Sequence, residues 1–226
     1  MSVIIYSANI GGYDNFNVPT TIDKDVRYIL FTDNKYFKSD VWEVNHVDFL
    51  KDLDYRRMAR YVKLNPHKLL PKHDISIWVD HCFTPKFNNS NLLLKNLNFT
   101  NKCNIMIFKH SWRNCIYEES EEVLRQKLDK VEIVNSQMQK YRKEGFPPNL
   151  GLFETGFIVR RNNELVNRFN DTWSNEVMSY SGRDQLSQMY SSWKTNLSID
   201  RITYGKSCYD NPFLERKKSH SVKLRF

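Results

Sequence analysis

Short apolar runs recur along this chain and alternate with longer amphipathic segments. The runs are rich in β-branched and aromatic residues, which predicts buried strands. We expect strands over residues 2–7, 25–32, 75–80, 104–108 and 152–160, with a weaker one over 41–47. Helical periodicity predicts helices over 54–64, 118–143, 164–177 and 184–193. Strands that alternate with helices, without internal repeats, indicate an α/β fold with a parallel or mixed central sheet.

The segment 118–143 carries the clearest helical pattern. Glutamates fill its first turns and basic residues its last turn, which complements the helix dipole. Gly145-Phe-Pro-Pro148 then ends the helix. Elsewhere, 87–100 reads as a connector with a short leucine-bearing helix, and the basic segment from 206 onwards is expected to be irregular.

Length and composition indicate one domain with a real core. The chain has 226 residues, 40% of them hydrophobic and 14% aromatic. No apolar run approaches the ~18 residues that span a bilayer. The first residues look like a strand and lack the basic start of a signal peptide, so a cytoplasmic location is expected. The four scattered cysteines form no CxxC pair, which argues against structural zinc and for reduced thiols.

The net charge of +8 and the pI near 9.2 favour an anionic partner. A nucleoside diphosphate and an acidic membrane surface, contacted peripherally through basic residues, are the two candidates that remain. Nucleic acid is not expected, because the chain contains no nucleic-acid-binding motif. P-loop, GxSxG, HExxH and GxGxxG motifs are also absent from the sequence.

Three aspartates stand at the ends of predicted elements: Asp33, Asp80 and Asp184. Ligands of open α/β sheets bind outside the carboxyl ends of the strands, where Asp33 and Asp80 are expected. Each aspartate has an alternative interpretation as a turn or helix-capping residue. The helix at 54–64 carries several cations near one face, namely Arg56, Arg57, Arg60 and Lys63. Carboxylates and cations together are typical of a site for a nucleotide sugar.

Two further segments carry candidate chemistry. The loop His110-Ser-Trp-Arg-Asn-Cys-Ile-Tyr117 combines an imidazole, an indole and a guanidinium, which is typical of a loop that binds sugar or phosphate. Its alternative is an aromatic loop that packs on the core. Glu154 lies inside an otherwise apolar strand flanked by Gly151 and Gly156, where a carboxylate is costly without a partner or a wet cavity.

An ordered series of these motifs resembles one known family. The series is Arg57-Met-Ala-Arg60, Ile77-Trp-Val-Asp80, His110-Ser-Trp-Arg113, Gly151-Leu-Phe-Glu-Thr-Gly156 and Gly182-Arg-Asp-Gln185. It is similar to the glycosyltransferase-like family, formerly a domain of unknown function, that includes the plant mucilage-related and turgor-regulation proteins. The resemblance covers roughly residues 3–197.

The resemblance implies a single GT-A-type domain over 1–226. Its Rossmann-like nucleotide-sugar half would span about 1–100 and its acceptor half about 101–205, with helices flanking a mixed central sheet and a basic tail over 206–226. Asp80 would belong to a DxD-like motif that binds a divalent cation, Mn²⁺ or Mg²⁺, on the diphosphate. Cys82 replaces the second carboxylate of that motif. His220 would be a second metal ligand.

The expected function is therefore transfer of a sugar from a nucleoside-diphosphate sugar to a glycan or other hydroxyl acceptor, as in polysaccharide biosynthesis. Asp184 is the first choice for the catalytic carboxylate and Glu154 the second. The remaining expected contacts are to the donor for Ser7, Ala8, Tyr13, Asp33, Arg57, Arg60, Lys63, Asp80 and Cys82, and to the acceptor for His110, Arg113, Thr155 and Gln185. The alternatives are a metal-assisted hydrolase that cleaves an amide, as in a ceramidase, and a non-catalytic module that binds nucleotides or glycans.

Overall fold

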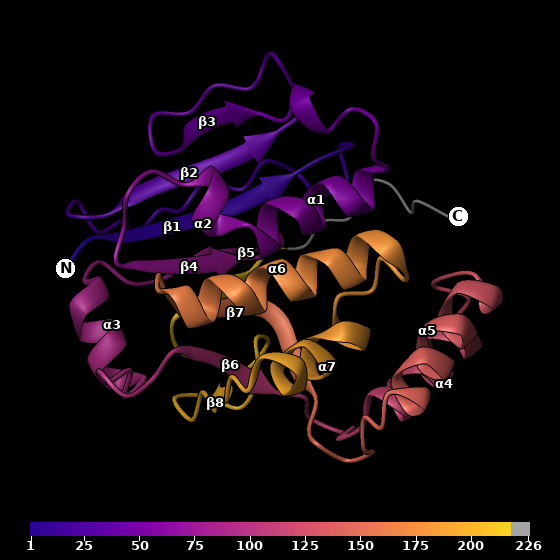
Figure 1. The fold of residues 1–226 in the computed structure, drawn as a ribbon. Coiled ribbons are helices and arrows are strands. Elements are labelled where there is room, and N and C mark those ends of the chain that lie inside the picture. Colours follow the sequence, from indigo (N-terminus) through magenta and orange to yellow (C-terminus); the bar gives the residue numbers. More distant parts are fainter. Residues whose placement is uncertain (218–226) are drawn as a thin grey trace.

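A mixed seven-stranded sheet forms the centre of the computed structural model, which describes residues 1–217 (Figure 1). Its strands are β1 (Val3–Asn9), β2 (Arg27–Thr32), β3 (Glu43–His46), β4 (Ile75–Val79), β6 (Ile105–Lys109), β7 (Phe153–Arg161) and β8 (Asp200–Arg201). They lie in the order β3-β2-β1-β4-β7-β6-β8. A separate antiparallel pair is formed by β5 (Phe83–Pro85) and β9 (Leu214–Arg216).

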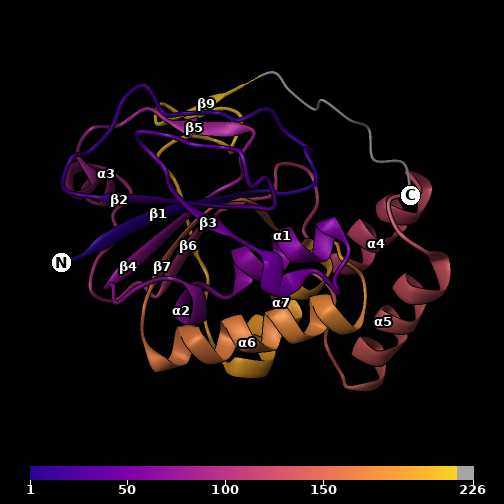
Figure 2. The ribbon, with the colours of Figure 1, turned by 90° about the horizontal axis from the view of Figure 1, so that it is seen from above.

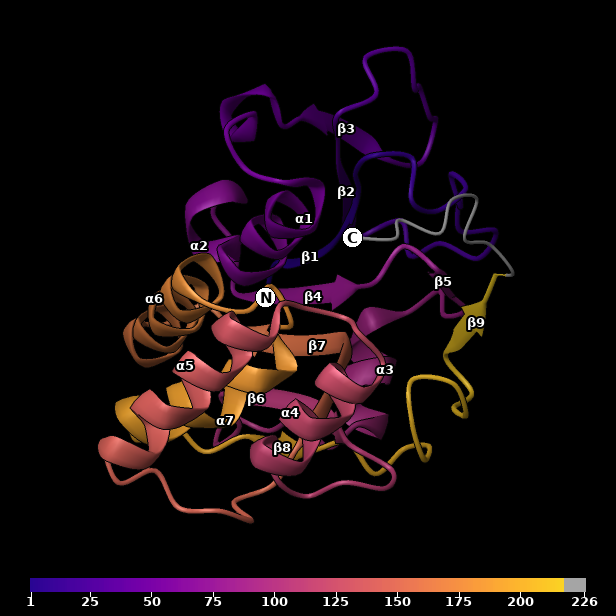
Figure 3. The ribbon, with the colours of Figure 1, turned by 90° about the vertical axis from the view of Figure 1, so that its right-hand side faces the viewer.

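Helices and the small strand pair cover opposite faces of this sheet (Figures 2 and 3). One face carries the helices α1 and α2, which precede β4, together with α6 and α7, which follow β7. The other face packs against α3 and the β5–β9 pair. The helices are α1 (Tyr55–Leu64), α2 (Pro66–Leu69), α3 (Ser90–Asn96), α4 (Ile116–Arg125), α5 (Val131–Lys143), α6 (Glu164–Ser179) and α7 (Gln185–Thr195), with a 3₁₀ turn at Asp48–Leu50.

Side chains of β1 show why both faces are apolar. Ile4 and Tyr6 point into the core beneath the helices, whereas Val3 and Ile5 point into the core beneath α3 and β5. Successive side chains of a strand alternate between faces, so a strand that is buried on both sides reads as a continuous apolar run. The expected fold class, an α/β fold with a mixed central sheet flanked by helices, is confirmed.

The strand directions bring several polar segments to one edge of the sheet. The strands β1, β2, β3 and β4 run parallel, while β7 runs antiparallel to both β4 and β6. The carboxyl ends of β1 and β4 therefore adjoin the amino end of β7. The backbone amide of Asp80 donates to the carbonyl of Gly156 at 2.8 Å and joins the two ends directly.

A bulge in β7 shapes the same edge. Ile107 of β6 pairs with Ile158, but the next residue, Phe108, pairs with Glu154. Thr155, Gly156 and Phe157 thus have no partners on β6. Extra residues of this kind bend a strand and redirect its side chains, and such bulges are frequent beside functional sites.

The single helix expected over 118–143 is wrong, because two helices, α4 and α5, occupy this segment. The break lies at Lys127, whose φ is 54°. Its amide donates to Leu124 and the next amide, of Leu128, donates to Val123, which together close the helix in a Schellman motif. α5 ends in the same motif at Gly145, where glycine marks the stop. The sequence gives no such signal at Lys127. Lysine seldom adopts a left-handed conformation, so its presence does not predict the end of a helix.

The segment expected to be irregular from 206 onwards contains β9, which pairs with β5 just after β4. The residues Cys208, Tyr209 and Arg216 of this segment lie close to the carboxyl end of β4. Within residues 1–217, no helix is long and apolar enough to cross a bilayer.

We predict that Lys127→Gly stabilises the protein. Glycine adopts the left-handed conformation without the steric cost that lysine bears, so the free energy of unfolding should rise by about 0.5–1 kcal/mol. Urea denaturation measures the change. The control Glu121→Gly, at an exposed position inside α4, should instead lower the free energy of unfolding by about 1 kcal/mol. A loss of stability in Lys127→Gly would contradict the assigned helix break.

Candidate active site

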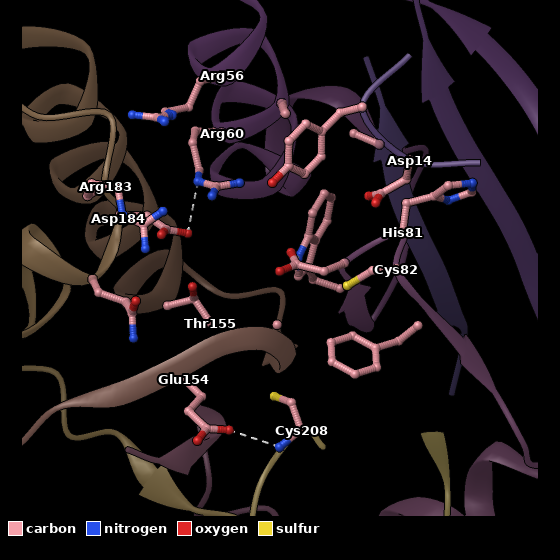
Figure 4. A pocket seen from close by; sticks show the side chains of 18 of the residues that line it. Asp14, Arg56, Arg60, His81, Cys82, Glu154, Thr155, Arg183, Asp184 and Cys208 are labelled. Atoms are coloured by element: carbon pink, nitrogen blue, oxygen red, sulfur yellow. Dashed lines mark hydrogen bonds and ion pairs between the residues drawn. The ribbon is translucent and has the colours of Figure 1, made fainter. Parts of the chain in front are cut away.

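A cavity of about 510 Å³ opens at the sheet edge where β1, β4 and β7 meet (Figure 4). This volume lies in the range of small-molecule sites. The structure brings ten of the residues expected at the site to its walls: Ala8, Tyr13, Arg60, Asp80, Cys82, His110, Glu154, Thr155, Asp184 and Gln185.

A buried ammonium group joins two of the three aspartates. Lys63 Nζ lies 2.6 Å from Asp184 Oδ2 and 3.3 Å from Asp80 Oδ1, and the lysine side chain is fully buried. Trp78 Nε1 donates to the same Asp80 oxygen at 2.6 Å. Asp80 is therefore held at the cavity wall through Oδ1.

Asp184 is almost wholly buried and lies between cations. Besides Lys63, Arg60 Nε approaches its Oδ2 at 3.3 Å. The neighbouring Arg60 and Lys63 lower the pKa of Asp184 against the opposing effect of burial. Although Asp184 directly precedes α7, its side chain does not cap that helix. A carboxylate whose pKa is held this low is a weak proton acceptor, so its geometry suits charge pairing more than base catalysis.

Glu154 occupies the opposite side of the cavity, at the start of β7 (Figure 4). Its Oε1 accepts a hydrogen bond from Ser111 Oγ at 3.1 Å, and its Oε2 accepts one from the amide of Cys208 at 2.9 Å. Both donors are neutral, and together they orient the carboxylate. Such a group keeps the capacity to accept a proton from a bound hydroxyl.

The loop between β6 and α4 stands next to Glu154. His110 Nδ1 accepts from the amides of Trp112 and Arg113, at 3.3 and 3.0 Å. This arrangement presents the Trp112 indole at the cavity wall, where it is 86% exposed. Arg113 itself turns away from the cavity and pairs with Glu119.

Four other expected donor residues lie behind the cavity walls. Ser7 is buried, and its hydroxyl contacts the His81 ring. Both carboxylate oxygens of Asp33 accept from the amide of Gly11, at 3.1 and 3.0 Å. Asp33 thus supports the 9–14 loop from outside the cavity. Lys63 lies beneath the wall, and Arg57 pairs with Asp54 and donates to the carbonyl of Tyr180. His220 lies outside the described residues.

Three arginines that the sequence interpretation did not assign also line the cavity: Arg56, Arg183 and Arg216. Arg216, on β9, lies over the ring of Tyr209. Arg56 stands one helical turn before Arg60 on α1, so the helical period was the signal for it. Its Nη1 donates to the carbonyl of Leu128 at 2.7 Å, in the break between α4 and α5. Arg183 directly precedes Asp184.

His81 fixes the loop that follows β1. The amide of Asn17 can only donate, so His81 Nε2 accepts from it at 3.0 Å, and Nδ1 then carries the proton towards Ser7 Oγ at 3.2 Å. The carbonyl of His81 accepts from the side chain of Asn17 at 2.7 Å. Burial lowers the pKa of His81 to about 4, so the ring is neutral at physiological pH.

The side chains around Asp80 do not form a suitable set of ligands for a divalent cation. Oδ1 already contacts Lys63 and Trp78, which leaves Oδ2 as its remaining oxygen. Burial and the Asp80 charge raise the pKa of the Cys82 thiol, and a protonated thiol is a poor metal ligand. Within residues 1–217, no three histidine, cysteine or acidic side chains gather as a metal site.

We predict that stability declines as the pH falls from 6.5 towards 4, because the unfolded chain protonates His81 while the folded chain resists it. The depressed pKa of Asp184 acts in another window, since its contribution is lost only as the pH falls below 3.8. Urea midpoints across the first window should decline less steeply for His81→Asn than for the wild type. The control His46→Asn, at an exposed position, should keep the wild-type slope; equal slopes for all three proteins would contradict this assignment.

Comparison with solved structures finds partial likenesses at low sequence identity. The WbbM bifunctional glycosyltransferase in its apo form is 14% identical, with a TM-score of 0.49, and the match covers 89% of this chain and 38% of that one. Mouse xyloside xylosyltransferase 1, also in its apo form, is 10% identical, with a TM-score of 0.48. The match covers 89% of this chain and 84% of that one. Neither likeness bears on substrate or mechanism.

Sequence comparison is more specific. The "Probable hexosyltransferase MUCI70" of Arabidopsis thaliana is 25% identical over 213 residues, which cover 82% of this chain and 36% of that protein. This chain therefore spans about a third of the relative's length. The model of the TOD1/MUCI70 glycosyltransferase-like domain matches residues 1–217, which include every element of the cavity described above. The chain belongs to the TOD1/MUCI70 glycosyltransferase-like domain family.

Proposed function

We propose that this domain transfers a sugar from a nucleoside-diphosphate sugar to a hydroxyl group of a glycan or other acceptor. The observation that carries the proposal is the division of the cavity. Arg56, Arg60 and Arg183 gather on one side, and the carboxylate of Glu154 lies on the other (Figure 4). Such an arrangement suits a substrate with an anionic leaving group at one end and a reacting hydroxyl at the other.

The donor would lie along the ends of β1 and β4. Ala8 and Tyr13 line this part of the cavity, and we assign them to the base and ribose. Asp33 supports the same loop from behind, and His81, which itself lines the cavity, holds it through the amide of Asn17. Arginine forks match phosphate oxygens, which assigns the diphosphate to the arginine side. Asp80, with Oδ2 still available, would accept a hydrogen bond from a hydroxyl of the donor sugar.

The reacting carboxylate is assigned to Glu154. In a single displacement, the acceptor oxygen forms a bond to the anomeric carbon while the bond from that carbon to the phosphate oxygen breaks. The bonding electrons leave with the nucleoside diphosphate, and the hydroxyl proton passes to Glu154. Asp184 is disfavoured as this base because Lys63 and Arg60 already compensate its charge. It would act instead by positioning those two cations.

The acceptor would lie against the loop beside Glu154. Trp112 presents an exposed indole there, and Tyr209 from the segment before β9 adds a second exposed ring. The apolar faces of pyranose rings pack well on such surfaces, since burial of the contact removes apolar area from water. The aromatic lining therefore supports a glycan acceptor over a small alcohol.

The two alternative functions have less support. A hydrolase with a metal-activated water needs a denser set of ligands than residues 1–217 offer around Asp80. A non-catalytic module would bind the donor at the same cavity without turnover.

The name of the Arabidopsis relative supports a hexose as the transferred sugar.

Glu154→Gln tests the catalytic assignment. Glutamine keeps the size of the side chain, and its amide can still accept from Cys208 and contact Ser111. We expect the kcat for sugar transfer to fall by about 10²- to 10⁴-fold, the usual contribution of a general base, while the Kd for the donor stays unchanged. The readouts are nucleoside-diphosphate release and calorimetric titration of the donor, with Glu121→Gln as the matched control. Donor binding without turnover in the wild type would instead identify a binding module.

Trp112→Ala tests the acceptor assignment. Loss of the indole should raise the KM for a glycan acceptor by about tenfold, or ~1.4 kcal/mol, and leave the donor Kd unchanged. Trp112→Phe should recover part of the loss because a flat apolar ring remains. Tyr36→Ala removes a 92% exposed ring outside the cavity and should change neither constant. An unchanged acceptor KM in Trp112→Ala would refute the assignment.

A further inference from the structure

Three guanidinium groups crowd the same side of the cavity (Figure 4). Burial lowers the pKa of Arg56, and the nearby charges of Arg183 and Arg60 lower it further, against the opposing effect of the Asp129 and Asp54 carboxylates. Cations that destabilise one another in a partly buried site favour the binding of an anion, which removes the repulsion. The geometry of this side therefore suits a multiply charged anion.

The positions of these arginines are set by the backbone around them. A Cβ on Gly182 would lie 2.9 Å from Arg56 Cδ, so the stem of Arg56 rests directly on the glycine. The Gly182 amide and the Ser181 hydroxyl both donate to Asp129 Oδ2, at 3.1 and 2.6 Å. With the carbonyl of Leu128, these contacts hold the Arg56 side chain in one place. The cationic side is thus preorganised, which lowers the cost of binding a rigid charged group.

The place beside Asp80 is already occupied by positive charge. Lys63 Nζ contacts both Asp80 and Asp184, at 3.3 and 2.6 Å, and its side chain is fully buried. A divalent cation on Asp80 would lie only a few ångströms from this ammonium, where repulsion is strong in a site of low dielectric. The possible metal ligands described above, Asp80 Oδ2 and the protonated Cys82 thiol, do not compensate for that repulsion.

We propose that Arg56, Arg60 and Arg183 bind the donor diphosphate without a divalent cation, and that Lys63 supplies fixed positive charge behind them. The inference rests on the proposed function, because it assigns the anion to the leaving group of a nucleotide sugar. Arg56 and Arg183 add positive charge to that of Arg60, which is shared with Asp184, and a planar guanidinium fork can contact two phosphate oxygens. The charge that develops on the leaving group as the glycosidic bond breaks would be stabilised by these fixed cations.

The first experiment measures affinity with and without metal. UDP, GDP and inorganic pyrophosphate are titrated calorimetrically into the full chain, once with excess EDTA and once with Mn²⁺. We expect at least one of these probes to bind in EDTA with a Kd within about threefold of its value in Mn²⁺. Binding that appears only with Mn²⁺ overturns the inference but leaves the proposed glycosyltransferase standing. Failure of every probe in both conditions refutes the inference and counts against the proposed function as well.

The second experiment tests the arginines. Arg183→Gln should weaken binding in EDTA by about tenfold and reduce its dependence on salt, since one charge-assisted contact is lost. Gly182→Ala keeps every charge but displaces Arg56, and we expect a comparable loss. Arg201→Gln, on the exposed strand β8 away from the cavity, is the control and should bind as the wild type does. Wild-type affinity in both Arg183→Gln and Gly182→Ala, with circular dichroism confirming their fold, would overturn the inference.

His220→Ala tests the one expected metal ligand outside the described residues. The inference requires its Kd in EDTA and in Mn²⁺ to match the wild type. A variant that loses a Mn²⁺-dependent gain in affinity would show that a metal contributes and would overturn the inference.

Discussion

The site depends on one buried ammonium group. Lys63 Nζ pairs with Asp184 and Asp80, which follow different elements of the fold, so a single side chain of α1 ties β4 to the start of α7. Its backbone is anchored as well, because the Lys63 carbonyl accepts from Tyr6 Oη and from Arg160 Nη2, both at 2.7 Å. A buried charge without partners is very costly, and here two carboxylates compensate it. The relative positions of α1, β4 and α7 are therefore coupled.

This coupling explains the division of labour in the cavity. Because Asp184 and Oδ1 of Asp80 are committed to Lys63, neither carboxylate is free to serve fully as a base or as a metal ligand. Glu154, held by two neutral donors on the far side, is left for proton transfer. Arg56, Arg60 and Arg183 line the side of the cavity near Asp184, which makes that side suited to an anion. Charge balance thus divides the cavity into two chemically different sides.

The sequence pattern predicted most of the elements, and the misses have physical causes. Strands that are buried on both faces and helices with a clear period can be recognised locally, as at β4 and α1. The break at Lys127 could not, because a left-handed lysine is stabilised by the packing of Leu128 and by the hydrogen bonds of the Schellman motif, not by its own preference. That break also supplies the carbonyl that holds Arg56. The small strand β9 was equally invisible, since its pairing with β5 is a long-range interaction.

By itself, the sequence determined the chemistry available: a strand that ends in Asp80, a basic helix before it, and a carboxylate at Glu154 in an apolar strand. It could not say which cations face the cavity, because that depends on the rotation of α1 against the sheet. Only the tertiary structure placed Arg56 inside and Arg57 outside, and paired Lys63 with residues far along the chain. Composition and periodicity are local properties, whereas charge compensation in a buried site is decided by three-dimensional neighbours.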